Sequence, residues 1–343
     1  MAGLYLHIPY CVKKCDYCDF VSFPDDGAIG EYVDLLIREI ELTAQAKLCN
    51  CTFDTVFFGG GTPSLLSGEQ MTRIMDALKT AFPIAEDAEC SMECNPGTAT
   101  PQNLRSYRAA GINRLSIGLQ TSHDSLLAAI GRIHTFLQFK DTLRAARDAH
   151  FDNISVDVMH GLPGQTQRAY LDTLKAVCDE QVRHISSYAL TLAEDTPLGA
   201  RVHAGEEQLP DADDVADMQD AGIDYLESRG YHRYEISNFA QPGFECRHNL
   251  NYWLNGEYLG LGVAAHSAVR LHEWTRYANV ETIREYERLI NRNRRPVREI
   301  IRLFPADEMF ECVMLGLRLT GGVDRRTFAE RFGVDMADAY PSA

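Results

Sequence analysis

The chain has 343 residues, of which 45% are hydrophobic and 24% are charged, and it carries a formal net charge of −16. This composition is typical of a globular protein and excludes collagen-like, largely disordered and disulfide-scaffold classes. The excess of acidic residues would repel a phosphate backbone, so no nucleic-acid partner is expected. The modest cysteine content, the lack of a signal-peptide pattern and the lack of a long apolar run predict a cytoplasmic protein with at most peripheral membrane contact.

Short apolar or β-branched runs alternate with segments of helical periodicity up to residue 190. The predicted strands are Leu4–Ile8, Thr55–Phe58, Cys90–Cys94, Arg114–Leu119, Ile154–Met159 and His184–Leu190. Helices are predicted near 31–47, 67–82, 100–110, 122–130, 136–150 and 167–181, with Ser67, Thr100 and Thr135 as N-caps. Such alternation implies parallel strands joined by right-handed crossovers, in a doubly wound sheet or a (β/α) barrel. Six strand–helix units favour an α/β fold with a partial (β/α)6 barrel.

Beyond residue 190 the pattern changes. The acidic segment from Asp211 to Asp220 is typical of a helix start, and this helix is predicted to reach Arg229. Residues 231–275 have the composition of short strands and loops, and further helices are predicted at 305–319 and from Asp324. We therefore expect a barrel over 1–230, a small α+β extension over 231–300, and a shortened helical C-terminal domain over 301–343.

Polar candidates follow the predicted strands at their carboxyl ends, where chemistry gathers in both architectures. Three cysteines follow the first strand, and Gly59-Gly60-Gly61-Thr62-Pro63 follows the second. Glu93 and Gln120 end the third and fourth strands, and Asp157 lies within the fifth. Buried carboxylates need partners, which could be arginines of the chain or the hydroxyl or ammonium groups of a ligand. We expect these side chains to share one rim.

Cys11, Cys15 and Cys18 form the pattern C-x3-C-x2-C. Three thiols so close together indicate metal binding or redox chemistry. One alternative is a closed zinc site completed by His7, which would make the chain a zinc-stabilised interaction module. Another alternative is that the three thiols are buried and chemically inert. The third is an iron–sulfur cube that lacks its fourth protein ligand and therefore keeps one iron open to an exogenous molecule.

The cysteine pattern after the first strand and Gly-Gly-Gly-Thr-Pro after the second resemble the radical S-adenosylmethionine (SAM) superfamily. The resemblance implies that Cys11, Cys15 and Cys18 hold a [4Fe-4S] cluster and that SAM occupies the open iron, where its reductive cleavage yields a 5′-deoxyadenosyl radical. Within the superfamily the chain resembles the branch typified by anaerobic coproporphyrinogen III oxidase, whose matching positions contact SAM or the surroundings of the cluster. The matching residues are Tyr5, Gly60, Gly61, Thr62, Glu93, Gln120, Arg132 and Asp157.

Tyr17 and Phe20 flank Cys18 and are expected to shield the cluster from water. Phe20 stands where coproporphyrinogen oxidases carry a further cysteine, and this departure disfavours porphyrinogen decarboxylation. The segment from His248 to Trp253 reads His-Asn-x-x-Tyr-Trp and resembles the pattern of the HemW branch, whose members are regarded as haem chaperones. The resemblance implies haem as a further ligand, with His248 as a candidate axial ligand and Cys246 as a second.

The resemblance thus favours a haem chaperone that binds a [4Fe-4S] cluster, SAM and haem and delivers haem to respiratory haemoproteins. The alternative is a radical SAM enzyme that decarboxylates, methylates or opens a tetrapyrrole. An electron donor such as flavodoxin or ferredoxin and a second copy of the chain in a homodimer are further expected partners. His266 is expected to be structural, and the remaining cysteines are interpreted as small hydrophobic residues: Cys49, Cys51, Cys90, Cys94, Cys178 and Cys312.

Overall fold

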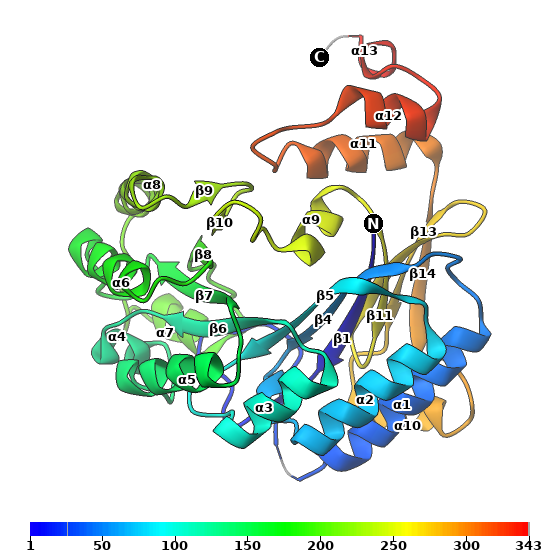
Figure 1. Cartoon of the computed structure of the whole chain (residues 1–343). Helices are drawn as coiled ribbons and strands as arrows, with labels where there is room; N and C mark the ends of the chain where they lie inside the picture. The colour runs from blue at the N-terminus through cyan, green and yellow to red at the C-terminus, as the bar shows by residue number, and fades with distance from the viewer. Residues whose placement is uncertain (26, 342–343) are drawn as a thin grey trace.

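The computed structural model describes residues 1–25 and 27–341 and contains one large sheet covered by helices (Figure 1). The sheet has 12 strands in the order β14-β13-β12-β11-β1-β4-β5-β6-β7-β8-β10-β9. Its centre consists of six parallel strands in chain order, which confirms the predicted partial barrel. They are β1 (Ala2–Ile8), β4 (Phe53–Gly60), β5 (Ile84–Cys94), β6 (Arg114–Gln120), β7 (Asn153–His160) and β8 (His184–Ala189).

Helices join these strands and cover the outer face of the sheet (Figure 1). They are α1 (Ile29–Gln45), α2 (Gly68–Ala81), α3 (Pro101–Ala110), α4 (Asp124–Ala129), α5 (Phe136–Asp148) and α6 (Gln167–Asp179). All three predicted N-caps are confirmed, because the side chains of Ser67, Thr100 and Thr135 each accept a hydrogen bond from the first turn of their helix. Three short elements accompany the cysteine and glycine segments: β2 (Tyr10–Cys11), β3 (Phe23–Pro24) and the 3-10 helix Pro63–Leu65.

The two faces of the central sheet differ in chemistry, as β1 illustrates. Leu4, Leu6 and Ile8 belong to the hydrophobic core, whereas Tyr5 and His7 line a cavity on the other face. Successive side chains of a strand point to opposite faces, so this alternation separates core from site. The outer face is therefore packed against helices, and the inner face is available for chemistry.

The remaining strands extend the sheet at both ends. After α7 (Pro197–His203) and α8 (Ala212–Ser228), the strands β9 (His232–Arg233) and β10 (Asn238–Ala240) continue it beyond β8. At the other end β11 pairs parallel with β1, and an antiparallel meander follows. The meander strands are β11 (Glu257–Leu261), β12 (His266–Arg270), β13 (Trp274–Asn279) and β14 (Val297–Leu303). The sheet is thus continuous across the expected boundary at residue 230.

Five further helices lie in the described part of the chain: α9 (Arg247–Trp253), α10 (Ile283–Ile290), α11 (Pro305–Gly316), α12 (Arg325–Phe332) and α13 (Met336–Ala339). Helix α9 corrects the prediction of only strands and loops over 231–275. In Figure 1, α9, α11 and α12 lie on the opposite side of the sheet from α1 to α3. No helix in the described part of the chain has both the length and the hydrophobicity needed to cross a bilayer.

Two cysteines correct the interpretation of the minor thiols as unpaired hydrophobic residues. Cys49 and Cys51 form a disulfide, with Cα atoms 5.5 Å apart, a separation that suits such a bond. A single intervening residue is enough to bring them together. Cys90, Cys94 and Cys178 are buried free thiols, as expected, and Cys312 is half-buried.

Candidate functional site

A cavity of about 550 Å³ opens at the carboxyl ends of β4 to β8. We call it the thiol cavity, because Cys11, Cys15 and Cys18 all line it. Nearly all the residues predicted to contact SAM or the cluster line it too, although they come from distant parts of the sequence. They are Tyr17, Phe20, Gly60, Gly61, Thr62, Glu93, Gln120, Arg132 and Asp157.

The three cysteines are free thiols on the segment that follows the first barrel strand, with Cys11 at the end of β2. The hydroxyl of Thr62 lies 3.5 Å from Cys11 Sγ, and Arg132 Nη1 lies 3.7 Å from Cys15 Sγ. A hydroxyl and a guanidinium aimed at sulfur stabilise thiolates, which are the ligand form of cysteine. Burial raises the pKa of Cys18. Three thiols facing one cavity fit an iron–sulfur cube with an open iron.

The geometry does not support the zinc alternative. His7 Nε2 lies 2.8 Å from the carbonyl oxygen of Val21, and Nδ1 lies 3.1 Å from the hydroxyl of Tyr5. Both ring nitrogens are therefore engaged away from the cysteines. Among the described residues no three His, Cys, Asp or Glu side chains are grouped at the spacing of a single metal ion. A cube separates its ligand sulfurs more widely than one ion does.

The glycine segment after β4 brings backbone close to the loop of the cysteines. Gly60 has φ +108°, and a Cβ there would lie 2.5 Å from the ring of His7. A Cβ on Gly61 would lie 2.7 Å from the carbonyl oxygen of Tyr10. Only glycine fits both positions, so the chain here presents backbone amides and carbonyls rather than side chains to the cavity.

Glu93 and Asp157 are half-buried carboxylates that face the cavity. Neither forms an ion pair with an arginine among the described residues, although the charges of Arg114 and Arg132 act on Asp157 and oppose the rise of its pKa. Glu93 accepts a hydrogen bond from the amide of Gly60 at 3.2 Å, and Asp157 accepts one from the hydroxyl of Ser116 at 3.0 Å. Burial and the proximity of Asp157 raise the pKa of Glu93 to about 8, and burial raises the pKa of Asp157. Carboxyls held this way suit a ligand with an ammonium or hydroxyl groups.

Arg132 forms hydrogen bonds with the segments at the carboxyl ends of two strands. Nη2 donates to the carbonyl of Gly118 at 2.7 Å, and Nη1 donates to Asn95 Oδ1 at 2.9 Å. Asn95 in turn donates to the hydroxyl of Thr62 at 2.9 Å. One guanidinium thus links β6, the segment after β5 and Cys15.

Gln120 lies at an irregularity in the pairing of β6 with β7 and has φ +71°. Its side chain accepts a hydrogen bond from the hydroxyl of Tyr188 at 3.1 Å. Backbone in this left-handed region is strained for a residue with a side chain, and such strain is common at functional sites. Sequence reasoning missed three residues that line the cavity and carry no motif of their own, namely Asn95, Ser116 and Tyr188. Thr191 also lines it, and Asn249 and Trp253 of the His-Asn-x-x-Tyr-Trp motif do so as well, although none of the three was predicted as a site residue.

Three of the predicted aromatic residues have different surroundings. Tyr17 is half-buried, and burial raises its pKa. Phe20 is 63% exposed and lines both the thiol cavity and a second cavity. Tyr5 lines only the second cavity, so it is the one predicted SAM residue outside the thiol cavity.

The structure does not support the haem-ligand roles predicted for His248 and Cys246. His248 is fully buried, its Nδ1 lies 2.7 Å from the hydroxyl of Thr55, and its Nε2 lies 2.9 Å from the hydroxyl of Tyr252. Neither ring nitrogen is free for iron. Cys246 is also buried, its thiol hydrogen-bonds to Glu89, and burial raises its pKa to about 12, which keeps it protonated.

The side chains of the His-Asn-x-x-Tyr-Trp motif point from helix α9 to three different surroundings. His248 packs against the sheet, stacked on Phe57 at 5.1 Å between ring centroids. Asn249 and Trp253, four residues apart and therefore on one helix face, line the thiol cavity. Tyr252 lines the second cavity. The motif thus forms a wall between the two cavities.

Known proteins resemble this chain in sequence and fold. Residues 5–177 match the radical SAM superfamily, and residues 303–343 match the HemN C-terminal domain. Heme chaperone HemW of Bacillus subtilis (strain 168) is 36% identical over 100% of this chain and 90% of its own length. Heme chaperone HemW of Escherichia coli (strain K12) is 39% identical over 78% of this chain and 70% of its own length.

Among solved structures, coproporphyrinogen III oxidase (HemN) from Escherichia coli superposes with a TM-score of 0.86 at 24% identity. The match covers 99% of this chain and 80% of that one, so the two proteins share their fold. The sequence match to the HemW proteins over the full length of the chain is closer in identity. The chain therefore belongs to the radical SAM superfamily and, within it, to the HemW family.

Proposed function

We propose that the protein is a haem chaperone, which holds a [4Fe-4S] cluster and SAM and delivers haem to respiratory haemoproteins. The observation that carries this proposal is the full-length relationship to proteins named heme chaperone HemW. The thiol cavity supports the cluster and SAM part, because three free thiols and two carboxyls that form no ion pair with the described residues face one space.

In this proposal each group of residues has a defined task. Cys11, Cys15 and Cys18 hold three irons of the cluster, which when bound supplies an open iron and an electron. The backbone around Gly60 and Gly61 receives the methionine end of SAM. Glu93 and Asp157 accept hydrogen bonds from its ammonium or its ribose hydroxyls. Arg132 keeps Cys15 and the strand ends in register.

Partners and location complete the proposal. Respiratory haemoproteins accept the haem, and a flavodoxin or ferredoxin donates electrons to the cluster. The protein acts in the cytoplasm, with at most peripheral contact to the membrane, and it forms a homodimer. The surplus of acidic residues supports the cytoplasmic assignment because a high net charge favours solubility.

A radical SAM enzyme acting on a tetrapyrrole is the second candidate, and it is less favoured. Phe20 occupies the position of the additional cysteine of coproporphyrinogen oxidases. The likeness to the Escherichia coli oxidase is one of fold, at 24% identity. Release of 5′-deoxyadenosine together with a modified tetrapyrrole would favour the enzyme. A chaperone should leave the tetrapyrrole unchanged.

Anaerobic reconstitution and a haem-transfer assay test the proposal. We expect about four irons per chain, stoichiometric haem binding seen as a Soret shift, and transfer of haem to an apo-cytochrome. Cys15→Ala should lose the cluster, and Cys312→Ala, whose thiol lies outside the thiol cavity, should keep it. A reconstituted chain that shows no saturable haem binding and transfers no haem to the apo-cytochrome would contradict the chaperone function.

A further inference from the structure

A second cavity, of about 560 Å³, lies between the cysteine loop, helix α9, the β11–β13 meander and helix α11. We call it the meander cavity. Asp19 and Phe20 line both cavities, so the two spaces adjoin at the cysteine loop. Its size falls within the range of about 300 to 1,000 Å³ that is usual for sites of drug-sized ligands and cofactors. Apart from Tyr5 and Phe20, none of the residues predicted to serve the cluster or SAM lines this space.

Aromatic rings form much of its wall. Tyr5 comes from β1, Tyr252 from α9 and Tyr258 from β11, and Phe20 contributes an exposed ring. Tyr252 and Tyr258 meet edge to face, with centroids 4.7 Å apart. Flat, rigid rings around a space of this size suit a flat, apolar macrocycle.

Three histidines lie in or beside this wall, and only one has a ring that is free to bind metal. His7 and His248 each hold hydrogen bonds at both ring nitrogens. His266, at the start of β12, is exposed and lines the cavity, and its ring makes no hydrogen bond or ion pair with the described residues. A neutral imidazole with a free nitrogen is the commonest protein ligand for haem iron.

A polar group without a partner lies in the same wall. Asn255 is only 2% exposed, and its Nδ2 has no hydrogen-bond acceptor among the described residues. Buried amides are normally satisfied, so an unpaired donor beside a cavity indicates a ligand that supplies the acceptor.

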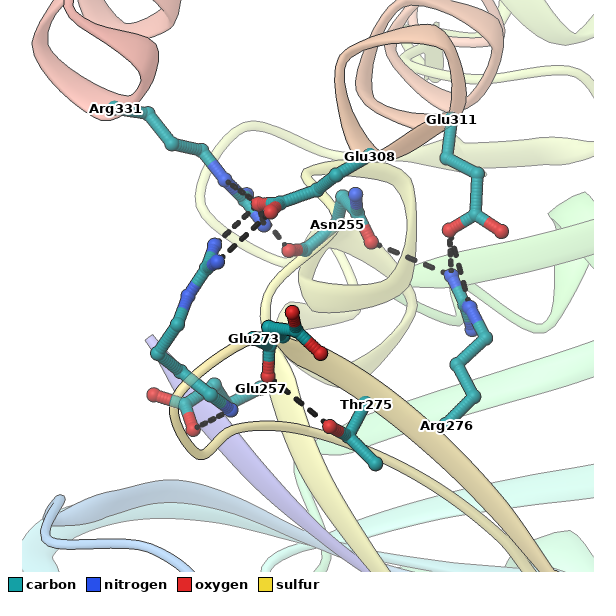
Figure 2. Close-up of polar contacts among 9 residues, drawn as sticks. Asn255, Glu257, Glu273, Thr275, Arg276, Glu308, Glu311 and Arg331 are labelled. Carbon is teal, nitrogen blue, oxygen red and sulfur yellow. Dashed lines mark hydrogen bonds and ion pairs between the residues drawn. The ribbon is translucent and has the colours of Figure 1, made fainter. Parts of the chain in front are cut away.

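The amide oxygen of Asn255 accepts from Arg276 Nη2 at 3.4 Å, and Arg276 also binds Glu311 of α11 (Figure 2). Figure 2 shows that Asn255, Arg276 and Glu311 form one polar corner, which joins the meander to the C-terminal helices. An amide donor beside a guanidinium offers hydrogen bonds to a carboxylate, and haem carries two propionates.

We propose that the meander cavity binds the haem cargo, with His266 as the axial ligand of the iron. This inference rests on the proposed chaperone function and assigns its haem site. The tyrosines and Phe20 pack against the porphyrin, and the corner formed by Asn255 and Arg276 receives a propionate. The site replaces the role that the sequence suggested for His248 and Cys246.

A spectroscopic haem titration of the full chain, with its cluster reconstituted, tests the proposal. We expect His266→Ala to raise the haem Kd about tenfold or more, since even partners of metal ligands contribute that much, and to remove the low-spin Soret band. Added imidazole should restore that band. His272→Ala is the matched control, because His272 is also exposed and lies in the turn between β12 and β13, outside the cavity.

The test separates the site from the function. If the parent chain binds haem and His266→Ala binds it with the same Kd and the same spectrum, the meander site is wrong and the chaperone function stands. If the parent chain does not bind haem at all, the proposed function itself fails. His266→Cys guards against a merely structural effect, because thiolate ligation should shift the Soret band while unchanged iron content shows that the fold is intact.

Discussion

At the scale of single residues, the protonation state of Glu93 depends on its surroundings and would respond to a bound ligand. Its pKa is raised to about 8 because the carboxyl is buried and lies near Asp157. In the free protein at neutral pH the group is therefore mostly protonated, and the energetic cost of an isolated buried charge is avoided. A cationic ligand that entered the thiol cavity would favour the ionised form.

This leads to a prediction for Glu93→Gln. Glutamine mimics the protonated acid, so the variant should fold and assemble its cluster as the parent chain does. It cannot become negatively charged, and we expect SAM to bind about tenfold more weakly. Calorimetric titration of the reconstituted protein with SAM measures this. Glu86→Gln, an exposed position on the same strand, is the control, and equal affinities for the two variants would remove Glu93 from the site.

His248 provides a second prediction at this scale. Because its ring nitrogens bind the buried hydroxyl of Thr55 and the part-buried hydroxyl of Tyr252, its removal would leave both hydroxyls without this partner. We expect His248→Ala to lower the free energy of unfolding by about 2 to 4 kcal/mol. The haem Kd of the folded protein should stay unchanged.

Denaturant unfolding and a haem titration of the same preparation measure the two effects. His203→Ala, at an exposed position on α7, should alter neither. If the His248→Ala protein is as stable as the parent chain but loses the Soret shift, His248 is a ligand of the haem iron and this prediction is wrong.

At the scale of elements, Glu39 of α1 connects this helix to the meander strands and to α10. It is 1% exposed and accepts hydrogen bonds from the amide of Gly262, the side-chain amide of Asn279 and the hydroxyl of Tyr286. One carboxyl therefore connects α1 with the turn after β11, the end of β13 and α10. Burial raises its pKa from 4.5 to about 7 despite these donors.

The raised pKa predicts a pH-dependent stability. Between its ordinary value and about 7, the folded chain keeps a proton on Glu39 that the unfolded chain has released. Stability from this group is therefore fully present at low pH and is lost as the pH rises through 7. The loss amounts to about 3 kcal/mol.

Other buried groups titrate as well, so the effect of Glu39 is measured as the difference in unfolding free energy between two proteins. Unfolding free energies of the parent chain and of Glu39→Gln are compared from pH 5 to pH 8. The parent should lose its advantage over the variant as the pH rises. A constant difference across this range would show that the pKa of Glu39 is not raised.

The same scale shows where sequence reasoning succeeds and where it fails. The barrel strands and most helices were predictable, because alternation within β1 and caps such as Ser67 are local patterns. The cysteines, Glu93, Gln120 and Asp157 could be placed at one rim because parallel strands bring their carboxyl ends together. The place of Arg132 in this site was indicated by the family resemblance. Helix α9 was missed, since Asn, Tyr, Trp and His favour helices weakly and only packing on the sheet fixes it.

The meander cavity could not be predicted either. Its wall forms because β11 pairs parallel with β1, which places Tyr258 near Tyr5 although more than two hundred residues separate them in the sequence. Strand pairing over such a distance leaves no local pattern. The free ring of His266 is likewise visible only once the partners of His7 and His248 are known.

At the scale of the whole molecule, the C-terminal helices are attached to the meander by charges. Glu308 of α11 is 4% exposed and binds Arg331 of α12 (Figure 2). It also binds Arg270 of β12. Arg331 also donates to the backbone carbonyl of Asn255 at 2.8 Å. A single carboxylate thus connects three elements beside the meander cavity.

Replacement of this carboxylate should loosen the C-terminal helices without unfolding the barrel. In Glu308→Gln the two arginines lose their shared anion, which we expect to cost about 2 kcal/mol, less than for a fully buried pair because both arginines are partly exposed. Local opening follows the weakest part of a structure. Hydrogen exchange should therefore speed up in α11 and α12, while β4 to β7 keep their protection. Glu330→Gln, whose partner Arg326 is exposed and one turn away, is the control. Uniformly faster exchange along the chain would instead show that the C-terminal helices and the barrel unfold as one unit.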